Sequence, residues 1–236
     1  MSGCLDRIIR IWNIPNKTVV AAHQNDDYIT AGAFSPLGDR IITGLAHGQC
    51  FIYELEDLTL RHLTQILCKN RRGIFSNVRK ITGIVFVDEK TFLVTTNDSR
   101  LRLYSLYSFE LLQKYKGLKN RSNPIRGSSS QCSMHIICGS EDGYVYIWDR
   151  YSKHVSLLNP KSLREPRIKN NSYEYFLASS VGKPVSAVFA PLNMVNELQR
   201  RMRDLGSDIM VSHVIVAGTT DGTLKVYYNQ FKNVEW

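Results

Sequence analysis

The first candidates for chemistry are a cysteine–histidine cluster. Cys132, His135 and Cys138 are each three residues apart, a spacing that suggests a zinc site. On a strand, however, side chains alternate between faces, so the two cysteines would point to one side and the histidine to the other. Tetrahedral zinc needs ligands that converge on one point. We therefore expect these residues to be structural and no metal ion to be bound.

Four aspartates also have the chemistry of acid–base groups: Asp6, Asp98, Asp142 and Asp221. Each occupies the same position of a recurring segment, which favours a structural role in a turn. No Ser/His/Asp triad can be placed without an arbitrary choice. The sequence also contains no Gly-x-Gly-x-x-Gly or Gly-Lys-Ser/Thr phosphate loop. We predict a non-catalytic protein without a cofactor.

The recurring segment determines the expected fold. Its five copies, each ending in an aromatic residue, are 3–12, 44–53, 95–104, 139–148 and 218–227. Asp stands six residues before the final aromatic in four copies, and His47 replaces it in the second. The positions three and one before the aromatic are apolar in all five, the alternation of a strand with one buried face. Each copy therefore predicts a strand, a tight turn and a second strand.

The spacing of the copies indicates a propeller. The final aromatics are 41, 51, 44 and 79 residues apart, and a four-stranded propeller blade takes about 40–45 residues. We expect an all-β propeller with these parts: a partial blade at 1–22 and blades at 28–67, 80–115, 123–158 and 183–236. The last gap is longer, and we assign inserts to about 159–182 and 193–210. Residues 193–208 have helix-forming composition, and Met194, Leu198, Met202 and Leu205 form an apolar stripe expected to pack on the propeller.

This pattern resembles the WD40 β-propeller family. Trp12 and Trp148 stand where the family has its tryptophan, Asp149 completes one Trp-Asp pair, and the four turn aspartates match as well. The Gly-His that opens a family repeat is missing, so the family's His–Ser/Thr–Asp–Trp hydrogen-bond network should be mostly incomplete. The family normally has about seven blades. We expect about five in this chain, as an excerpt of a roughly seven-bladed ring, or else an open arc or a pairing of two copies.

A narrower resemblance concerns function. Five segments resemble a trafficking subgroup of this family, whose animal members are effectors of a Rab GTPase of recycling endosomes: 2–15, 79–84, 93–104, 114–117 and 139–148. The resemblance implies a protein-interaction scaffold, cytoplasmic and peripheral on endosomal or Golgi membranes. A Rab would bind through regions outside this chain.

Composition excludes several other classes. Of 236 residues, 30 are Lys or Arg and 21 are Asp or Glu, which gives a formal net charge of +9. No apolar run is long enough for a spanning helix, and the N-terminus lacks a signal-peptide core. The five cysteines are scattered and odd in number, which favours free thiols in a reducing compartment.

The positive charge is concentrated in three connections between blades, which the blade geometry places on one face. We predict that this face binds a partner through the following residues: Lys69, Arg71, Arg72, Phe75, Arg79, Lys80, Lys116, Lys119, Arg121, Arg126, Lys161, Arg164, Arg167 and Lys169. The partner would be an acidic protein segment or anionic phospholipid headgroups. Simple solvation of a charged surface is the alternative. RNA binding is a further alternative, disfavoured because the basic residues of these connections are not interleaved with aromatic residues for base stacking, apart from Phe75.

Overall fold

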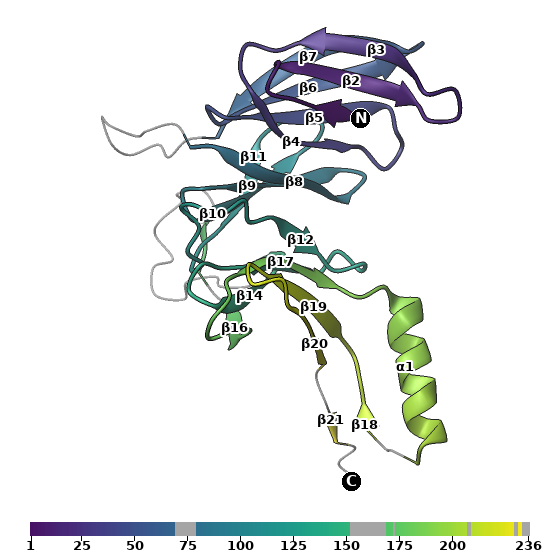
Figure 1. The fold of residues 1–236 in the computed structure, drawn as a ribbon, viewed down its shortest axis with the longest axis vertical. Helices are drawn as coiled ribbons and strands as arrows, with labels where there is room; N and C mark the ends of the chain where they lie inside the picture. The colour runs from purple at the N-terminus through teal and green to yellow at the C-terminus, as the bar shows by residue number, and fades with distance from the viewer. Residues whose placement is uncertain (69–78, 152–168, 172, 207–208, 229–230, 233–236) are drawn as a thin grey trace, which may run out of the picture.

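The computed structural model describes residues 1–68, 79–151, 169–171, 173–206, 209–228 and 231–232. Their strands form small antiparallel sheets that lie one after another along the long axis of the molecule (Figure 1). The all-β prediction, a propeller-like stack of small sheets, is confirmed. The described residues contain one helix.

The first two sheets follow the chain order, and the third does so with one added strand. The first contains β1 (Ser2–Gly3), β2 (Ile8–Asn13) and β3 (Thr18–Gln24). The second contains β4 (Ile29–Phe34), β5 (Arg40–Leu45), β6 (Gln49–Glu56) and β7 (Thr59–Leu67). The third contains β8 (Ile81–Asp88), β9 (Thr91–Thr96), β10 (Arg100–Ser105) and β11 (Leu111–Tyr115), and β15 (Lys169–Asn170) pairs with β11 in parallel.

The remaining sheets carry the departures from the repeat. The fourth contains β12 (Gly127–Ser129), β13 (His135–Gly139), β14 (Tyr144–Asp149) and β16 (Glu174–Leu177). The fifth contains β17 (Pro184–Phe189), β19 (Val214–Thr219) and β20 (Leu224–Tyr228). β18 (Ile209–Met210) and β21 (Phe231–Lys232) form a separate pair.

The strand β16 corrects one predicted boundary. Residues 159–182 were expected to be an insert preceding the fifth blade, with the fourth blade ending at residue 158. Instead β16 pairs with β14, with Tyr146 opposite Tyr175, and is the outer strand of the fourth sheet. The extra residues therefore lie between the third and fourth strands of one sheet, a connection whose length the repeat spacing does not specify.

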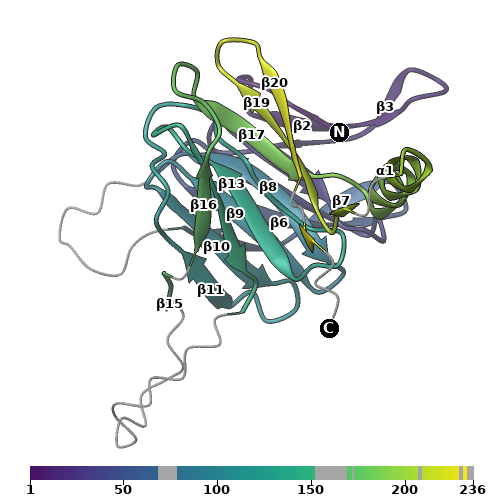
Figure 2. The ribbon, with the colours of Figure 1, turned by 90° about the horizontal axis from the view of Figure 1, so that it is seen from below.

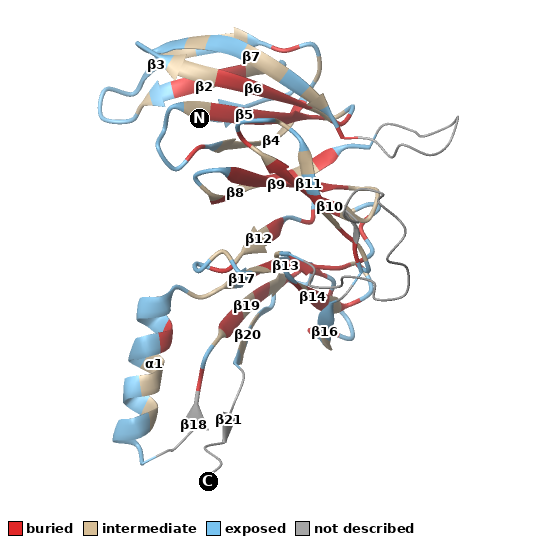
Figure 3. Ribbon diagram, turned by 180° about the vertical axis from the view of Figure 1, so that it is seen from behind, coloured by how far each residue is buried: buried red, intermediate tan, exposed pale blue. Residues whose placement is uncertain are grey.

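Hydrophobic cores lie between consecutive sheets. Because side chains alternate along a strand, each middle sheet contributes one set of apolar residues to the sheet before it and another to the sheet after it. Leu101 and Leu103 of β10 pack with Ile136 and Trp148 of the fourth sheet. Tyr104, on the other face of β10, packs with Cys50 and the second sheet. Buried residues accordingly concentrate along the middle strands, as Figure 3 shows.

The recurring aspartate fixes the hairpin of several sheets. In the third sheet Asp98 pairs with Arg102, with Oδ2 and Nη2 2.5 Å apart, and both side chains are almost fully buried. Burial acts to raise the pKa of the Asp98 carboxyl, but the hydrogen bond and charge of Arg102 lower it below its ordinary value. In the first sheet Asp6 pairs with Arg10 in the same way at 2.6 Å, but the side chains are 39% and 29% exposed. The same pair is thus buried in one sheet and hydrated in another.

The outward sides of the first and fifth sheets differ in exposure from the equivalent positions inside the stack. Trp12 is 43% exposed, whereas Trp148 is 1% exposed. Leu224 and Val226 are 71% and 57% exposed, whereas Leu101 and Leu103, at the same repeat positions, are fully buried. In the part of the chain that the structure describes, no further sheet covers these two sides.

The helix α1 (Leu192–Asp204) lies in the connection between β17 and β19. The predicted apolar stripe is only half right, because Leu198 and Met202 pack against a small core but Met194 and Leu205 are 62% and 85% exposed. Val195, three residues before Leu198, is the buried member of the helix. Val195, Leu198 and Met202 pack on Val211 and Val214, which lie where the chain returns to the fifth sheet.

Burial predicts different costs for the same substitution in two sheets. Asp98→Ala leaves the Arg102 guanidinium buried without its carboxylate, which should lower the free energy of unfolding by about 3–5 kcal/mol. Asp6→Ala exposes Arg10 to water that already solvates it, so its cost should be far smaller. Urea unfolding of both variants at pH 7 tests this expectation. Equal losses would contradict burial as the cause.

Candidate interaction surface

One face of the stack combines the hairpins with the connections between sheets. At each of four hairpins, a backbone N–H donates to a carbonyl of the connection that precedes its sheet. The pairs are Ala46 to Tyr28, Asn97 to Lys80, Glu141 to Lys119 and Thr220 to Lys183, at 2.8–3.1 Å. Lys80, Lys119 and Lys183 are all exposed. These bonds therefore place three lysines from three connections on the hairpin face.

The connection before the fourth sheet is held by Asn120. This side chain is fully buried, and its amide nitrogen lies 3.4 Å from the Thr82 hydroxyl and from the Thr96 carbonyl. Its backbone exchanges two hydrogen bonds with the Ser99 hydroxyl, at 3.0 and 3.2 Å. The loop is thereby tied to the third sheet, and the neighbouring Lys119 and Arg121 are exposed on either side of the buried asparagine.

Glu141 fixes the same loop from the fourth sheet. Its Oε1 accepts the backbone N–H groups of Arg121, Ser122 and Asn123 at 3.0, 2.6 and 2.8 Å, and the Asn123 amide at 3.1 Å. Burial acts to raise the pKa of Glu141, but these donors outweigh it and lower the pKa to about 2. The carboxylate stays ionised and organises the backbone that presents Arg121.

The other hairpin carboxylates are also bonded locally. Asp142 accepts the Tyr146 hydroxyl at 2.9 Å. Asp221 accepts the hydroxyls of Thr219 and Thr223, and these bonds lower its pKa to about 2. These acids bond to their own hairpins, whereas the lysines of the adjacent connections are exposed to solvent. Such a surface attracts anions.

The structure brings together only some of the predicted partner-binding residues. Arg79, Lys80, Lys119 and Arg121 are exposed on the hairpin face or at its edge. Lys116 is half-buried, and its carbonyl accepts the Trp148 indole N–H at 3.0 Å. Lys169 lies in β15. The other predicted residues lie outside the described residues: Lys69, Arg71, Arg72, Phe75, Lys161, Arg164 and Arg167.

Arg126 is exposed as well, but its side chain also contacts the neighbouring sheet. Its guanidinium Nη2 donates to the carbonyl of Ile84 at 2.9 Å, and its side chain covers Gly83. This arginine joins the fourth sheet to the innermost strand of the third, so we assign it to inter-sheet contact.

Sequence reasoning missed Asn120 and Glu141 because neither belongs to the repeat pattern. The available signal was local: Asn, Ser and Pro cluster around Asn120, and Glu141 directly precedes a turn aspartate. His47, which replaces the turn aspartate in the second sheet, pairs instead with Asp27 of the preceding connection. In the second sheet the acidic residue, Asp27, is therefore in the connection and not in the hairpin turn.

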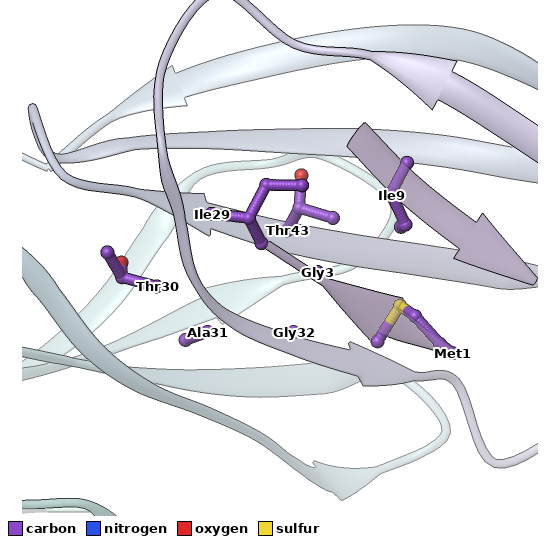
Figure 4. Close-up of a pocket in the computed structure, with 8 residues that line it drawn as sticks. All are labelled: Met1, Gly3, Ile9, Ile29, Thr30, Ala31, Gly32 and Thr43. Atoms are coloured by element: carbon purple, nitrogen blue, oxygen red, sulfur yellow. The ribbon is translucent and has the colours of Figure 1, made fainter. Parts of the chain in front are cut away.

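Two other candidate sites have little support. Cys132 is exposed and Cys138 is buried, and the described residues contain no group of three or more His, Cys, Asp or Glu able to hold a metal. A cavity of about 190 Å³ lies between the first two sheets, lined by Met1, Ile9, Ile29 and small residues (Figure 4). It is smaller than typical ligand pockets of about 300–1,000 Å³. Among the described residues, no helix is long and apolar enough to span a membrane.

Known proteins share this architecture. The family model for the WD domain, G-beta repeat, matches residues 120–149, which include the Asn120 loop and the hairpin of the fourth sheet. The computationally designed Ika8 protein superimposes with a TM-score of 0.58 over 96% of this chain and 54% of that chain, at 19% identity. The five repeated hairpins and the match to the WD domain model agree. The chain belongs to the WD40-repeat family of β-propeller proteins.

Two relatives give a more specific comparison. WD repeat-containing protein 44 of Xenopus laevis is 35% identical over 99% of this chain, which spans 27% of that protein. The 2-deoxy-glucose resistant protein 2 of Saccharomyces cerevisiae is 26% identical over 66% of this chain and 21% of its own length. The chain thus spans about a quarter of the length of these relatives.

The Glu141 contacts predict an acid-dependent contribution to stability. The folded pKa of Glu141 lies below its ordinary value of 4.5, so its contribution is complete above pH 5 and disappears as the pH falls toward 2. Glu141→Ala should therefore unfold at lower urea concentration than the parent at pH 7. At pH 2.5 the two midpoints should approach each other. A difference independent of pH would contradict an ionised carboxylate as the cause.

Proposed function

We propose that this protein is a non-catalytic interaction scaffold that acts in vesicle or endosomal membrane traffic and binds anionic partners through its hairpin face. The family supports a role in binding proteins, and the similarity to WD repeat-containing protein 44 supports the trafficking assignment. A Rab GTPase would bind through regions outside this chain. The protein would be cytoplasmic and attach peripherally to endosomal or Golgi membranes.

The observation that carries the proposal is the fixed presentation of basic side chains. Lys119 and Arg121 project from a loop held by Asn120 on one side and by Glu141 on the other. A rigid loop loses little conformational entropy when it binds, so more of the electrostatic attraction appears as affinity. Lys80 and Lys183 extend the same positive region over the third and fifth sheets.

RNA binding is a second candidate that one observation favours. Tyr173 and Tyr175 are 39% and 58% exposed. Tyr173 packs against Gly117 of the connection before the fourth sheet, residues 116–126, which we call the basic loop. The fold thus places exposed aromatic rings, which base stacking requires, beside Lys116. Tyr175→Ala should weaken binding of a single-stranded RNA if this candidate is right, and should leave binding of acidic peptides or vesicles unchanged.

Charge reversal tests the proposed surface. Lys119→Glu with Arg121→Glu should weaken binding to a Glu-rich peptide or to phosphatidylserine vesicles by at least about 30-fold, since each basic residue near an anionic surface contributes about 1 kcal/mol and each glutamate adds repulsion. Vesicle co-sedimentation and fluorescence anisotropy of a labelled peptide measure the two affinities.

The matched control is Lys17→Glu with Lys90→Glu, which changes the net charge equally. Lys17 and Lys90 are exposed in turns at the opposite ends of their strands, away from the hairpin face. This control should keep the affinity of the parent. Equal effects of the two double variants would show that only overall charge matters.

A further inference from the structure

The loop between β16 and β17 carries exposed apolar side chains next to the basic residues. Val181 is 87% exposed and Leu177, the last residue of β16, is 54% exposed. Lys183 follows two residues after Val181. In Figure 2 this loop and the β19–β20 hairpin project at the same end of the molecule.

Hydrogen bonds show that this loop belongs to the hairpin face. The N–H groups of Ala178 and Ser179 donate to the Gly143 carbonyl of the β13–β14 hairpin, at 2.9 and 3.1 Å. The same hairpin is bonded through Glu141 to Lys119 and Arg121 on its other side. The apolar loop and the basic loop therefore lie on either side of one hairpin.

The loop is fixed at both ends, so its apolar tip is held outward. The Ser179 hydroxyl accepts the N–H groups of Val181 and Gly182 at 3.4 and 3.1 Å. Lys183 exchanges two hydrogen bonds with Thr220, at 2.9 and 3.0 Å. Gly182 is packed so closely against the Asp221 carboxylate that a Cβ atom would lie 2.6 Å from it. Collapse of Val181 onto the protein would break these contacts.

We propose that the hairpin face docks on an anionic phospholipid bilayer, with Val181 and Leu177 inserted between headgroups and with Lys119, Arg121 and Lys183 on the phosphates. This inference rests on the proposed function and selects the membrane surface over an acidic protein segment. An acidic segment uses the positive charges alone. A bilayer interface takes apolar side chains and basic side chains together, since acyl chains and phosphates lie within a few ångströms of each other.

The charge of this region is compatible with that surface. Among the described residues of these loops and hairpins, the acidic side chains are Glu141, Asp142 and Asp221, and the last two are exposed. Lys225, whose Nζ donates to the Ala178 carbonyl at 2.9 Å, joins Lys119, Arg121 and Lys183, so that four basic side chains stand beside three acidic ones. Lys119, Arg121 and Lys183 are exposed. The positive ends of the long side chains reach headgroup phosphates while the loop tip enters the interface.

The test separates apolar insertion from charge attraction. Val181→Ser with Leu177→Ser should weaken co-sedimentation with phosphatidylcholine–phosphatidylserine vesicles by about tenfold, because apolar burial in the bilayer is lost. The same variant should bind inositol hexakisphosphate, a soluble polyanion, as the parent does. Leu37→Ser with Leu58→Ser removes two side chains of similar exposure, 68% and 58%, from turns on the opposite face and is the matched control.

The outcomes distinguish this inference from the proposed function. If the apolar variant and the parent bind vesicles equally while Lys119→Glu with Arg121→Glu abolishes binding to vesicles and inositol hexakisphosphate, membrane insertion is wrong and the basic face remains. If the parent binds neither probe, the proposed function itself fails. Loss of vesicle binding in the Leu37/Leu58 control as well would also overturn the inference, because the effect would not be specific to this loop.

Discussion

The structure depends on the packing of each small sheet against the next. A three- or four-stranded sheet has two faces, and one alternating strand supplies apolar residues to both neighbours. β10 shows this directly, since Leu101 and Leu103 face the fourth sheet while Tyr104 faces the second. The same repeat positions are buried inside the stack and exposed at its two outer sides, as at Leu224 and Trp12. The core is therefore a property of neighbouring sheets and not of any single one.

This constraint leaves the hairpin ends free to vary. The apolar positions of the five hairpins are needed for packing, but the turn and the connection beside it only have to satisfy their own polar groups. Asp98 does so through a buried Arg102, Asp142 through a tyrosine, and His47 through an aspartate of the adjacent connection. Such local solutions explain how one architecture carries loops of different charge. On this chain the result is a face with fixed basic loops.

Much of the fold could be predicted from spacing and alternation. The positions of Ile9, Leu101 and Val145 predict the strands, and the turn aspartates predict the hairpins between them. The expectation of one buried face per strand was wrong inside the stack, because β10 is buried on both faces. The strand β16 could not be located, because its four residues contain no repeat signature and follow a connection of irregular length. The helix stripe was predicted in part for a similar reason: helical spacing identifies an apolar face, but the neighbours decide whether Val195 or Met194 is covered.

The candidate surface divides in the same way between sequence and structure. The sequence by itself determined the repeat, its hairpins, the excess of positive charge and the connections that carry it, because these follow from residue types at fixed spacings. Only the tertiary structure decided that Asn120 and Glu141 hold the basic loop, that Arg126 is used between sheets, and that Val181 lies across a hairpin from Lys119. Those relations join residues from different sheets, and their proximity is set by how the sheets pack.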